Sequence, residues 1–248
     1  MPVIKNKWLR QLIGQGVTLF IHRFMRSPVS AAHQEYSMIY SQHDNPGKPD
    51  EALIDMALAA IAEARKIDLS FIATRTTQTY PNPNEFPGEH YRLLTGLIKV
   101  LKPLTVIEIG TERGISSLAM KAALPDGSKI HTFDIKPYHE MKEPVLRQTD
   151  LDKSLIQHVT DLTRPETQQQ FRSLFEEADF IFMDAAKDGQ MERTFLRFFN
   201  SVSFKHKPVL MIDDIHNWNM LAIWREIELP KLDVSSFGHF TGTGLVLL

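Results

Sequence analysis

One acid and two glycines stand close together near the middle of the chain, in the spacing Glu108-x-Gly110-x-x-x-Gly114. The run before Gly110 is apolar and β-branched, which is typical of a buried parallel strand that ends in a tight turn. In open α/β sheets, ligands bind at the carboxyl ends of the strands. The turn that carries Thr111 and Ser116 is therefore predicted to form the floor of a pocket.

This spacing differs from the Gly-x-Gly-x-x-Gly fingerprint of dinucleotide-binding folds. Glu112 stands where a second glycine would let a pyrophosphate approach the backbone, and its carboxylate would repel a diphosphate. The next predicted strand ends at Asp134, whose carboxylate can accept hydrogen bonds from both hydroxyls of a ribose. The pattern indicates a nucleoside ligand. A dinucleotide-dependent oxidoreductase is the least favoured function, because Glu112 occupies the approach of the phosphates. The alternative is an ordinary strand-turn-helix unit in which Gly110 is only a turn residue.

Two later strands also end in carboxylates: Asp184 follows the fourth predicted strand, and Asp213 and Asp214 follow the fifth. Neighbouring parallel strands bring their carboxyl ends side by side, so the three side chains should converge at the edge of the pocket. They would repel one another unless a cation sat between them. Oxygen ligands suit hard ions, so Mg²⁺ is the first candidate, with Mn²⁺ or Ca²⁺ next. The alternative is that Asp184 and Asp213 only cap helices.

At the Glu108 motif and Asp134 the chain resembles the class I S-adenosylmethionine (SAM)-dependent methyltransferases, whose nucleoside ligand carries no phosphate. The resemblance implies that Asp161, after the third predicted strand, hydrogen-bonds the adenine amine; capping of the following helix is the alternative. Ser116 could meet the SAM carboxylate together with a helix N-terminus. The implied cofactor-binding residues are Glu108, Gly110, Thr111, Gly114, Ser116, Asp134, Asp161 and Asp184.

The carboxylate pattern narrows the resemblance to the cation-dependent O-methyltransferases of the catechol and caffeoyl-coenzyme A type. Their fourth strand ends Asp-x-x-Lys, matched by Asp184 and Lys187, and their fifth ends Asp-Asn, where this chain has Asp213 and Asp214. The resemblance implies that these three carboxylates hold a cation that chelates two vicinal hydroxyls of a small substrate. It also implies that Lys187, with a pKa lowered beside the cation, accepts the hydroxyl proton. The segment Phe86–Glu89 looks like the entrance to the SAM site.

Asp214 departs from the asparagine of that family, and the form Asp-Asp-Ile-His also looks like a group that includes cephalosporin hydroxylase-like proteins. We expect a SAM-dependent O-methyltransferase that acts on a small hydroxylated molecule. Two alternatives stay open: a metal-dependent hydroxylase-like or other non-methylating enzyme, and a non-catalytic nucleoside-binding module. His216 is a candidate base or substrate contact, with a helix cap or a packed ring as the alternative.

Strands and helices alternate from residue 89 onward. The pattern predicts an α/β fold: a Rossmann-like, seven-stranded, mostly parallel sheet with helices on both faces and a C-terminal antiparallel hairpin. Expected strands are 104–110, 129–135, 156–160, 179–185, 207–213, 234–238 and 243–248. Expected helices are 51–66, capped by Asp50, then 89–101, 114–123, 139–149, 164–177, 189–200 and 217–227.

Residues 1–80 are predicted to form a helical N-terminal extension, and residues 81–248 the methyltransferase domain, with the proline-rich stretch 80–88 between them. Before Glu35 every charged residue is a cation, and apolar residues recur there at near-helical spacing. Packing on the domain or on a partner subunit of a homo-oligomer, a peripheral membrane contact through residues 1–27, and a cleaved targeting peptide are the three interpretations.

The composition fits a soluble globular protein, since 43% of residues are hydrophobic and 23% charged. A formal net charge of −2 gives no case for nucleic-acid binding. The chain has no cysteine, which excludes disulfides, thiolate metal sites and cysteine nucleophiles. No apolar run is long enough for a membrane-spanning helix, so the expected location is cytoplasmic, with the peripheral membrane contact as a variant.

Overall fold

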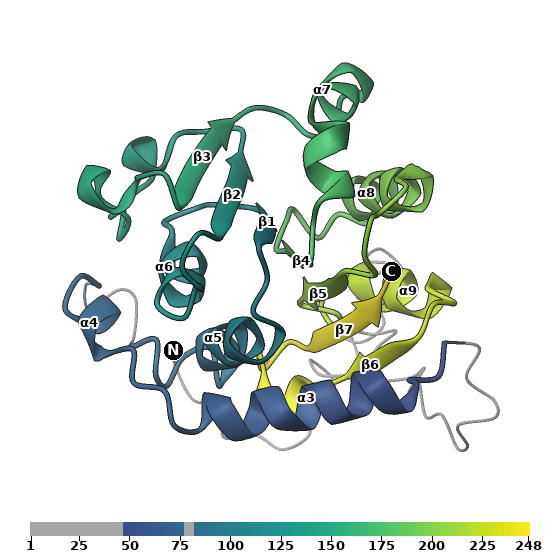
Figure 1. The fold of residues 1–248 in the computed structure, drawn as a ribbon, viewed down its shortest axis with the longest axis horizontal. Helices are drawn as coiled ribbons and strands as arrows, with labels where there is room; N and C mark the ends of the chain where they lie inside the picture. The colour runs from purple at the N-terminus through teal and green to yellow at the C-terminus, as the bar shows by residue number, and fades with distance from the viewer. Residues whose placement is uncertain (1–46, 77–81) are drawn as a thin grey trace, which may run out of the picture.

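The computed structural model describes residues 47–76 and 82–248 (Figure 1). The basic segment at residues 1–34 and the predictions made for it lie outside these residues. Helices α3 (Glu51–Ala64), α4 (Ser70–Ala73) and α5 (His90–Leu101) precede the sheet, and Asp50 caps α3 by accepting the Leu53 N–H at 2.8 Å. In the described ranges, no helix has the length and apolar character that crossing a bilayer would require.

Seven strands of the described chain form one sheet in the order β3-β2-β1-β4-β5-β7-β6. Strands β1 to β5 pair in parallel, whereas β7 runs antiparallel between β5 and β6. The predicted α/β class, the mostly parallel sheet and the C-terminal antiparallel pair are therefore confirmed. The strands are β1 (Thr105–Ile109), β2 (Lys129–Asp134), β3 (Leu155–Val159), β4 (Phe180–Met183), β5 (Val209–Asp213), β6 (Lys231–Asp233) and β7 (Thr243–Leu247).

Side chains alternate between the two faces of the sheet, and a separate apolar cluster lies on each face. One cluster joins α3, α5 and α6 (Ile115–Lys121) to one side of the central strands. The other joins α7 (Pro165–Glu176), α8 (Gln190–Ser201) and α9 (Met220–Glu226) to the opposite side (Figure 1). In β5 the alternation puts Asp213 on the same face as Met211, which packs in the α5 cluster. This placement brings Asp213 toward α5.

Helix α3 packs closely on α5. A Cβ on Gly96 would lie 2.4 Å from the Ala60 carbonyl oxygen, so the two helix backbones cross almost in contact. Leu53, Ala57 and Ala60 of α3 belong to the same buried cluster as the first half of α5. Residues 47–76 therefore contribute to the core of the sheet domain. The domain boundary between residues 80 and 81 stays a prediction.

Two predicted elements are wrong. The helix expected near 139–149 is replaced by 3₁₀ turns at Tyr138–Glu140 and Gln148–Asp150, because Pro144 cannot continue a helix and the Leu146 N–H bonds the Arg113 carbonyl instead. The strand expected at 234–238 lies earlier in the chain, at Lys231–Asp233. The Asp233 carboxylate accepts the Ser235 N–H at 2.9 Å and turns the chain into a short 3₁₀ segment.

Candidate functional site

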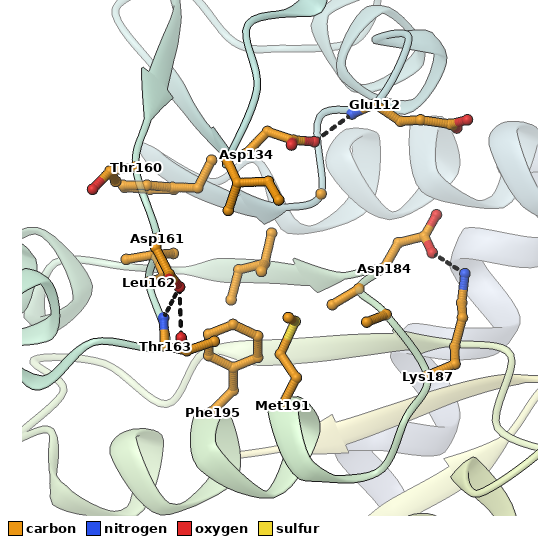
Figure 2. Close-up of a pocket in the computed structure, with 16 residues that line it drawn as sticks. Glu112, Asp134, Thr160, Asp161, Leu162, Thr163, Asp184, Lys187, Met191 and Phe195 are labelled. Atoms are coloured by element: carbon orange, nitrogen blue, oxygen red, sulfur yellow. Dashed lines mark hydrogen bonds and ion pairs between the residues drawn. The ribbon is translucent and has the colours of Figure 1, made fainter. Parts of the chain in front are cut away.

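A cavity of about 410 Å³ opens at the carboxyl ends of β1, β2, β3 and β4 (Figure 2). This is the edge of the sheet at which a ligand site was expected. Its walls include apolar side chains from α8 and from the turns after β2 and β3: Ile135, Leu162, Met191 and Phe195. Among the predicted site residues, Gly110, Asp134, Asp161, Asp184 and Lys187 line it.

The carboxylates of Asp134 and Asp161 are held by hydrogen bonds from the turns at the edge of the cavity. Asp134 accepts the N–H of Glu112 at 2.9 Å and that of Lys136 at 3.1 Å. Asp161 accepts the N–H of Thr163 at 2.9 Å and its hydroxyl at 2.5 Å, and these hydrogen bonds lower the pKa of Asp161. Asp161 therefore stabilises a local turn and does not provide the N-cap of α7. Both carboxylates are fixed at the cavity before any ligand binds (Figure 2).

Glu108 lies under the cavity and does not line it. Its side chain is fully buried and accepts a hydrogen bond from the Ser117 hydroxyl in α6. Burial raises the pKa of Glu108 to about 7, against the hydrogen bonds that it accepts from Ser116, Ser117 and Thr132. Thr111, at 2.6 Å from the Thr132 hydroxyl, is also buried there and outside the lining. These motif residues support the floor of the cavity from below.

The two motif glycines permit close packing. Gly110 has φ +104°, and a Cβ there would lie 2.0 Å from the Asp184 carbonyl oxygen, so only glycine lets the turns after β1 and β4 touch. Gly114 has φ +82°, and its Cβ would lie 2.5 Å from the Cβ of Leu146. Gly114 therefore leaves room for the side chain of Leu146.

A second cavity, of about 160 Å³, adjoins the first. The two cavities share Glu112, Asp184 and Lys187. Phe86 and Pro87, predicted at the entrance to the SAM site, line this smaller cavity instead of the larger one. Its remaining lining residues are His90, Tyr91, Ile115, Asp213 and His239.

Lys187 bridges two of the predicted metal ligands. Its Nζ lies 2.6 Å from Asp184 Oδ1 and 2.8 Å from Asp214 Oδ2. Burial lowers the pKa of Lys187, but the two carboxylates outweigh this and hold the pKa well above its usual range. The lowered pKa was predicted for Lys187 beside a bound cation, and it stays a prediction.

Asp213 is the buried, unpaired member of the cluster. Its side chain is 3% exposed, and its Oδ1 has no hydrogen-bond partner within the described part of the chain. The nearest nitrogen is Nδ1 of His90, at 3.4 Å, itself buried and unpartnered there. Burial, with the charges of Asp184 and Asp214, raises the pKa of Asp213 well above its ordinary value, and burial lowers the pKa of His90 to about 3. An unpaired buried carboxylate oxygen of this kind suits a cation.

A possible ligand set stands around that oxygen. Asp213, Asp214 and His239 each offer one ligand atom, and these atoms lie within 4.8 Å of one another. Two carboxylates and an imidazole are a chemically suitable donor set for a divalent ion. The residues present therefore fit a divalent cation at this place.

Sequence reasoning missed His239 and His90. His239 becomes part of the site because residues 86–88 and 238–240 lie side by side: Gly88 forms a β-bridge with His239, and the Phe240 N–H bonds the Pro87 carbonyl at 3.0 Å. No spacing in the sequence signals this pairing. His216 lines neither cavity. Its Nε2 lies 2.8 Å from Asp233 Oδ2. The side chain of His216 is 38% exposed, so it is not a packed ring, and its catalytic role stays a prediction.

The fold is the Rossmann-like fold of methyltransferases. A crystal structure of an O-methyltransferase from Bacillus cereus, in complex with SAH, superposes with a TM-score of 0.50 at 17% identity and covers 76% of this chain and 90% of that one. A sequence model described as O-methyltransferase matches residues 61–221, more than half of the chain. The chain belongs to this O-methyltransferase family.

Individual relatives match a shorter stretch. Caffeoyl-CoA O-methyltransferase 2 of Petunia hybrida is 32% identical over 107 residues, which are 40% of this chain and 42% of that protein. Caffeoyl-CoA O-methyltransferase of Mesembryanthemum crystallinum is 34% identical over 104 residues, 39% of each chain. The match spans only about two fifths of these curated relatives. The resemblance to the caffeoyl-coenzyme A type that the sequence predicted is confirmed.

Proposed function

We propose that this protein is a SAM-dependent O-methyltransferase that methylates a hydroxyl of a small molecule with the help of a divalent cation. The observation that carries the proposal is the junction of two cavities at Asp184 and Lys187. The larger has Asp134 at one end and a volume in the range of small-ligand pockets. The smaller contains the buried carboxylate of Asp213. A cofactor in one and a substrate in the other would meet at the junction.

The larger cavity offers contacts suited to a nucleoside. The Asp134 carboxylate, fixed by two backbone N–H groups, keeps further lone pairs for ribose hydroxyls. Ile135 and Leu162 provide apolar surface for a base, and Asp161 stands next to Leu162. When bound, SAM would supply an electrophilic methyl group. The family membership, and the SAH bound to the Bacillus cereus relative, support this choice of cofactor.

The smaller cavity would receive the acceptor. Phe86 and Tyr91 line it, and Phe240 lies 5.8 Å from Phe86 between ring centroids, so aromatic surface borders the carboxylates. This combination supports a hydroxylated aromatic substrate, in line with relatives named for caffeoyl-CoA. Asp184, Asp213 and Asp214 are the cation ligands predicted from the sequence, and a bound cation would lower the pKa of a substrate hydroxyl.

Lys187 is the group placed to receive the hydroxyl proton. Its ammonium lies at the junction of the cavities, between Asp184 and Asp214. Because these carboxylates raise its pKa, Lys187 keeps its proton in this arrangement. Lys187 could accept the hydroxyl proton only if a bound cation offset the negative charge of these carboxylates and so lowered the pKa of Lys187.

Calorimetric titration of the purified chain with SAM and with SAH, each with and without Mg²⁺, tests the proposal. Micromolar binding is expected, followed by transfer of a labelled methyl group from SAM to a compound with vicinal phenolic hydroxyls. Absence of binding in every condition would overturn the assignment of the cofactor. Turnover of a substrate without consumption of SAM would instead favour a non-methylating enzyme.

A further inference from the structure

The three carboxylates predicted as metal ligands are not equivalent in the structure. The Lys187 ammonium pairs with both Asp184, at 2.6 Å from its Oδ1, and Asp214, at 2.8 Å from its Oδ2. What sets Asp184 apart is that it is absent from the group of ligand atoms that lie within 4.8 Å of one another. Asp213 and Asp214 belong to that group, and its third member is His239. Asp214 thus pairs with Lys187 and also belongs to the group that contains a histidine, whereas Asp184 pairs with Lys187 and lies outside that group.

We infer that the third protein ligand of the cation is His239, so that the site is made of two carboxylates and one imidazole and prefers Mn²⁺ to Mg²⁺. The inference rests on the proposed function only for the presence of a cation. It replaces Asp184 in the predicted oxygen-only set with a nitrogen ligand. It therefore changes the class of ion that the site selects.

Two contacts fix His239 beside Asp214. The Thr241 hydroxyl touches both the Asp214 carboxylate and the imidazole Nδ1 of His239, so one residue ties the two candidate ligands together. The backbone N–H of His239 donates to the Thr243 hydroxyl at 2.7 Å, which anchors the loop to β7. Ligand side chains held by such outer contacts need little reorganisation when an ion binds.

A second, independent observation points to an ion at this place. His90 is 1% exposed, and its Nδ1 has no hydrogen-bond partner within the described residues. That nitrogen lies 3.4 Å from the equally unpartnered Oδ1 of Asp213. Two buried polar atoms without partners cost free energy of folding. A bound cation would orient the Asp213 carboxylate so that His90 could hydrogen-bond to it as an outer contact of the site. His90 is thus a positioning residue for Asp213.

The donor set decides the choice of ion. Mg²⁺ binds through oxygen atoms and demands octahedral geometry, whereas imidazole suits transition metals. Mn²⁺ accepts carboxylate, water and imidazole ligands together. His239 therefore increases the affinity of the site for Mn²⁺ more than its affinity for Mg²⁺. The preference is expected to exceed about tenfold in dissociation constant, because the imidazole nitrogen adds to the affinity for Mn²⁺ and adds little to that for Mg²⁺.

The test measures Mn²⁺ and Mg²⁺ binding to the metal-free full chain by calorimetry, and nitrogen coupling to bound Mn²⁺ by pulsed electron paramagnetic resonance. His239→Gln is expected to weaken Mn²⁺ binding at least about tenfold, to change Mg²⁺ binding less than about threefold, and to abolish the nitrogen signal. Asp184→Asn should leave Mn²⁺ binding within about threefold. His206→Gln, the same change at an exposed histidine, is the matched control.

The His239→Asp variant, which exchanges the nitrogen for an oxygen ligand, should shift the preference toward Mg²⁺. Titration with SAH checks that every variant is folded. Full Mn²⁺ affinity or a persisting nitrogen signal in His239→Gln, with loss of affinity in Asp184→Asn, would overturn the inference and restore the oxygen-only set. If the wild type bound Mn²⁺ with a nitrogen signal but did not bind SAH, this inference would hold while the proposed function failed.

Discussion

The two ends of the site are built in opposite ways. At the Asp134 end, the carboxylates of Asp134 and Asp161 are satisfied by N–H or hydroxyl groups from nearby turns, as when Asp161 accepts both donors of Thr163. At the Asp213 end, the groups come from α5, from the ends of β4 and β5, and from the loop before β7, and two buried polar atoms have no partner among the described residues. The first end is prearranged by its own backbone. The second is assembled from distant segments and holds unpaired polarity that a ligand can satisfy.

Removal of the carboxylates at the Asp213 end should have the largest effect. With Asp213→Ala combined with Asp214→Ala, methyl transfer should fall about 10³-fold, because a cation that stabilises developing charge contributes several kcal/mol. Affinity for SAH, measured by calorimetry, should change less than about threefold, since these residues do not line the larger cavity. Transfer that kept its dependence on divalent ions in this variant would rule out the cation site.

Gly110→Ala tests the contact between the two ends. A Cβ at φ +104° and 2.0 Å from the Asp184 carbonyl oxygen must push the turns after β1 and β4 apart. The free energy of unfolding in urea should fall by about 3–4 kcal/mol. Gly127→Ala is the matched control: φ is also positive, at +84°, but nothing lies within 4 Å of the added atom. It should cost only about 1 kcal/mol.

Glu108 should make stability depend on pH. Its pKa is about 7 in the folded protein and near 4.5 when unfolded, so between these values the folded state binds the extra proton. Stability is thus greatest below the unfolded pKa and falls by up to about 3 kcal/mol as the pH rises through the folded pKa. In Glu108→Gln this part of the pH dependence should vanish from urea unfolding measured between pH 4.5 and 8. An unchanged slope would mean that Glu108 is ionised in the fold.

The prearranged end should show the smallest effects. Asp134→Asn removes the charged acceptor for ribose hydroxyls and should weaken SAH binding about tenfold, or about 1.4 kcal/mol. Asp161→Asn should change it less than about threefold, because that carboxylate is already occupied by Thr163. Calorimetry on both variants compares them directly. A larger loss of affinity with Asp161→Asn than with Asp134→Asn would contradict this prediction, since it would mean that Asp161 makes the main polar contact with the ligand.

The same contrast explains what the sequence could predict. The strands, their order along the chain and the acids after β2, β4 and β5 follow from local apolar runs and from the rule that ligands meet the carboxyl edge of the sheet. The pairing of the 86–88 and 238–240 segments follows from no local pattern, so His239 was not identified. His90 opens α5 with no special spacing, and only the fold turns it toward Asp213.

Local competition accounts for the elements that were wrong. The stretch 139–149 has helical composition, yet Pro144 removes a donor and the Arg113 carbonyl captures the next two N–H groups. The sequence predicted that Lys187 lies beside the carboxylates. It did not predict that Lys187 would pair with both Asp184 and Asp214.

The position of β7 has a consequence for how the protein is made. This strand comes last in chain order among the strands of this sheet, yet it lies between β5 and β6. The loop that carries His239 precedes it directly. A nascent chain that ends after β5 already contains Asp134, Asp184 and Asp213, but it lacks the segment that closes over them. If the proposed cation site exists, a chain that stopped before the loop ahead of β7 would lack His239 and should pass through synthesis without acquiring the ion.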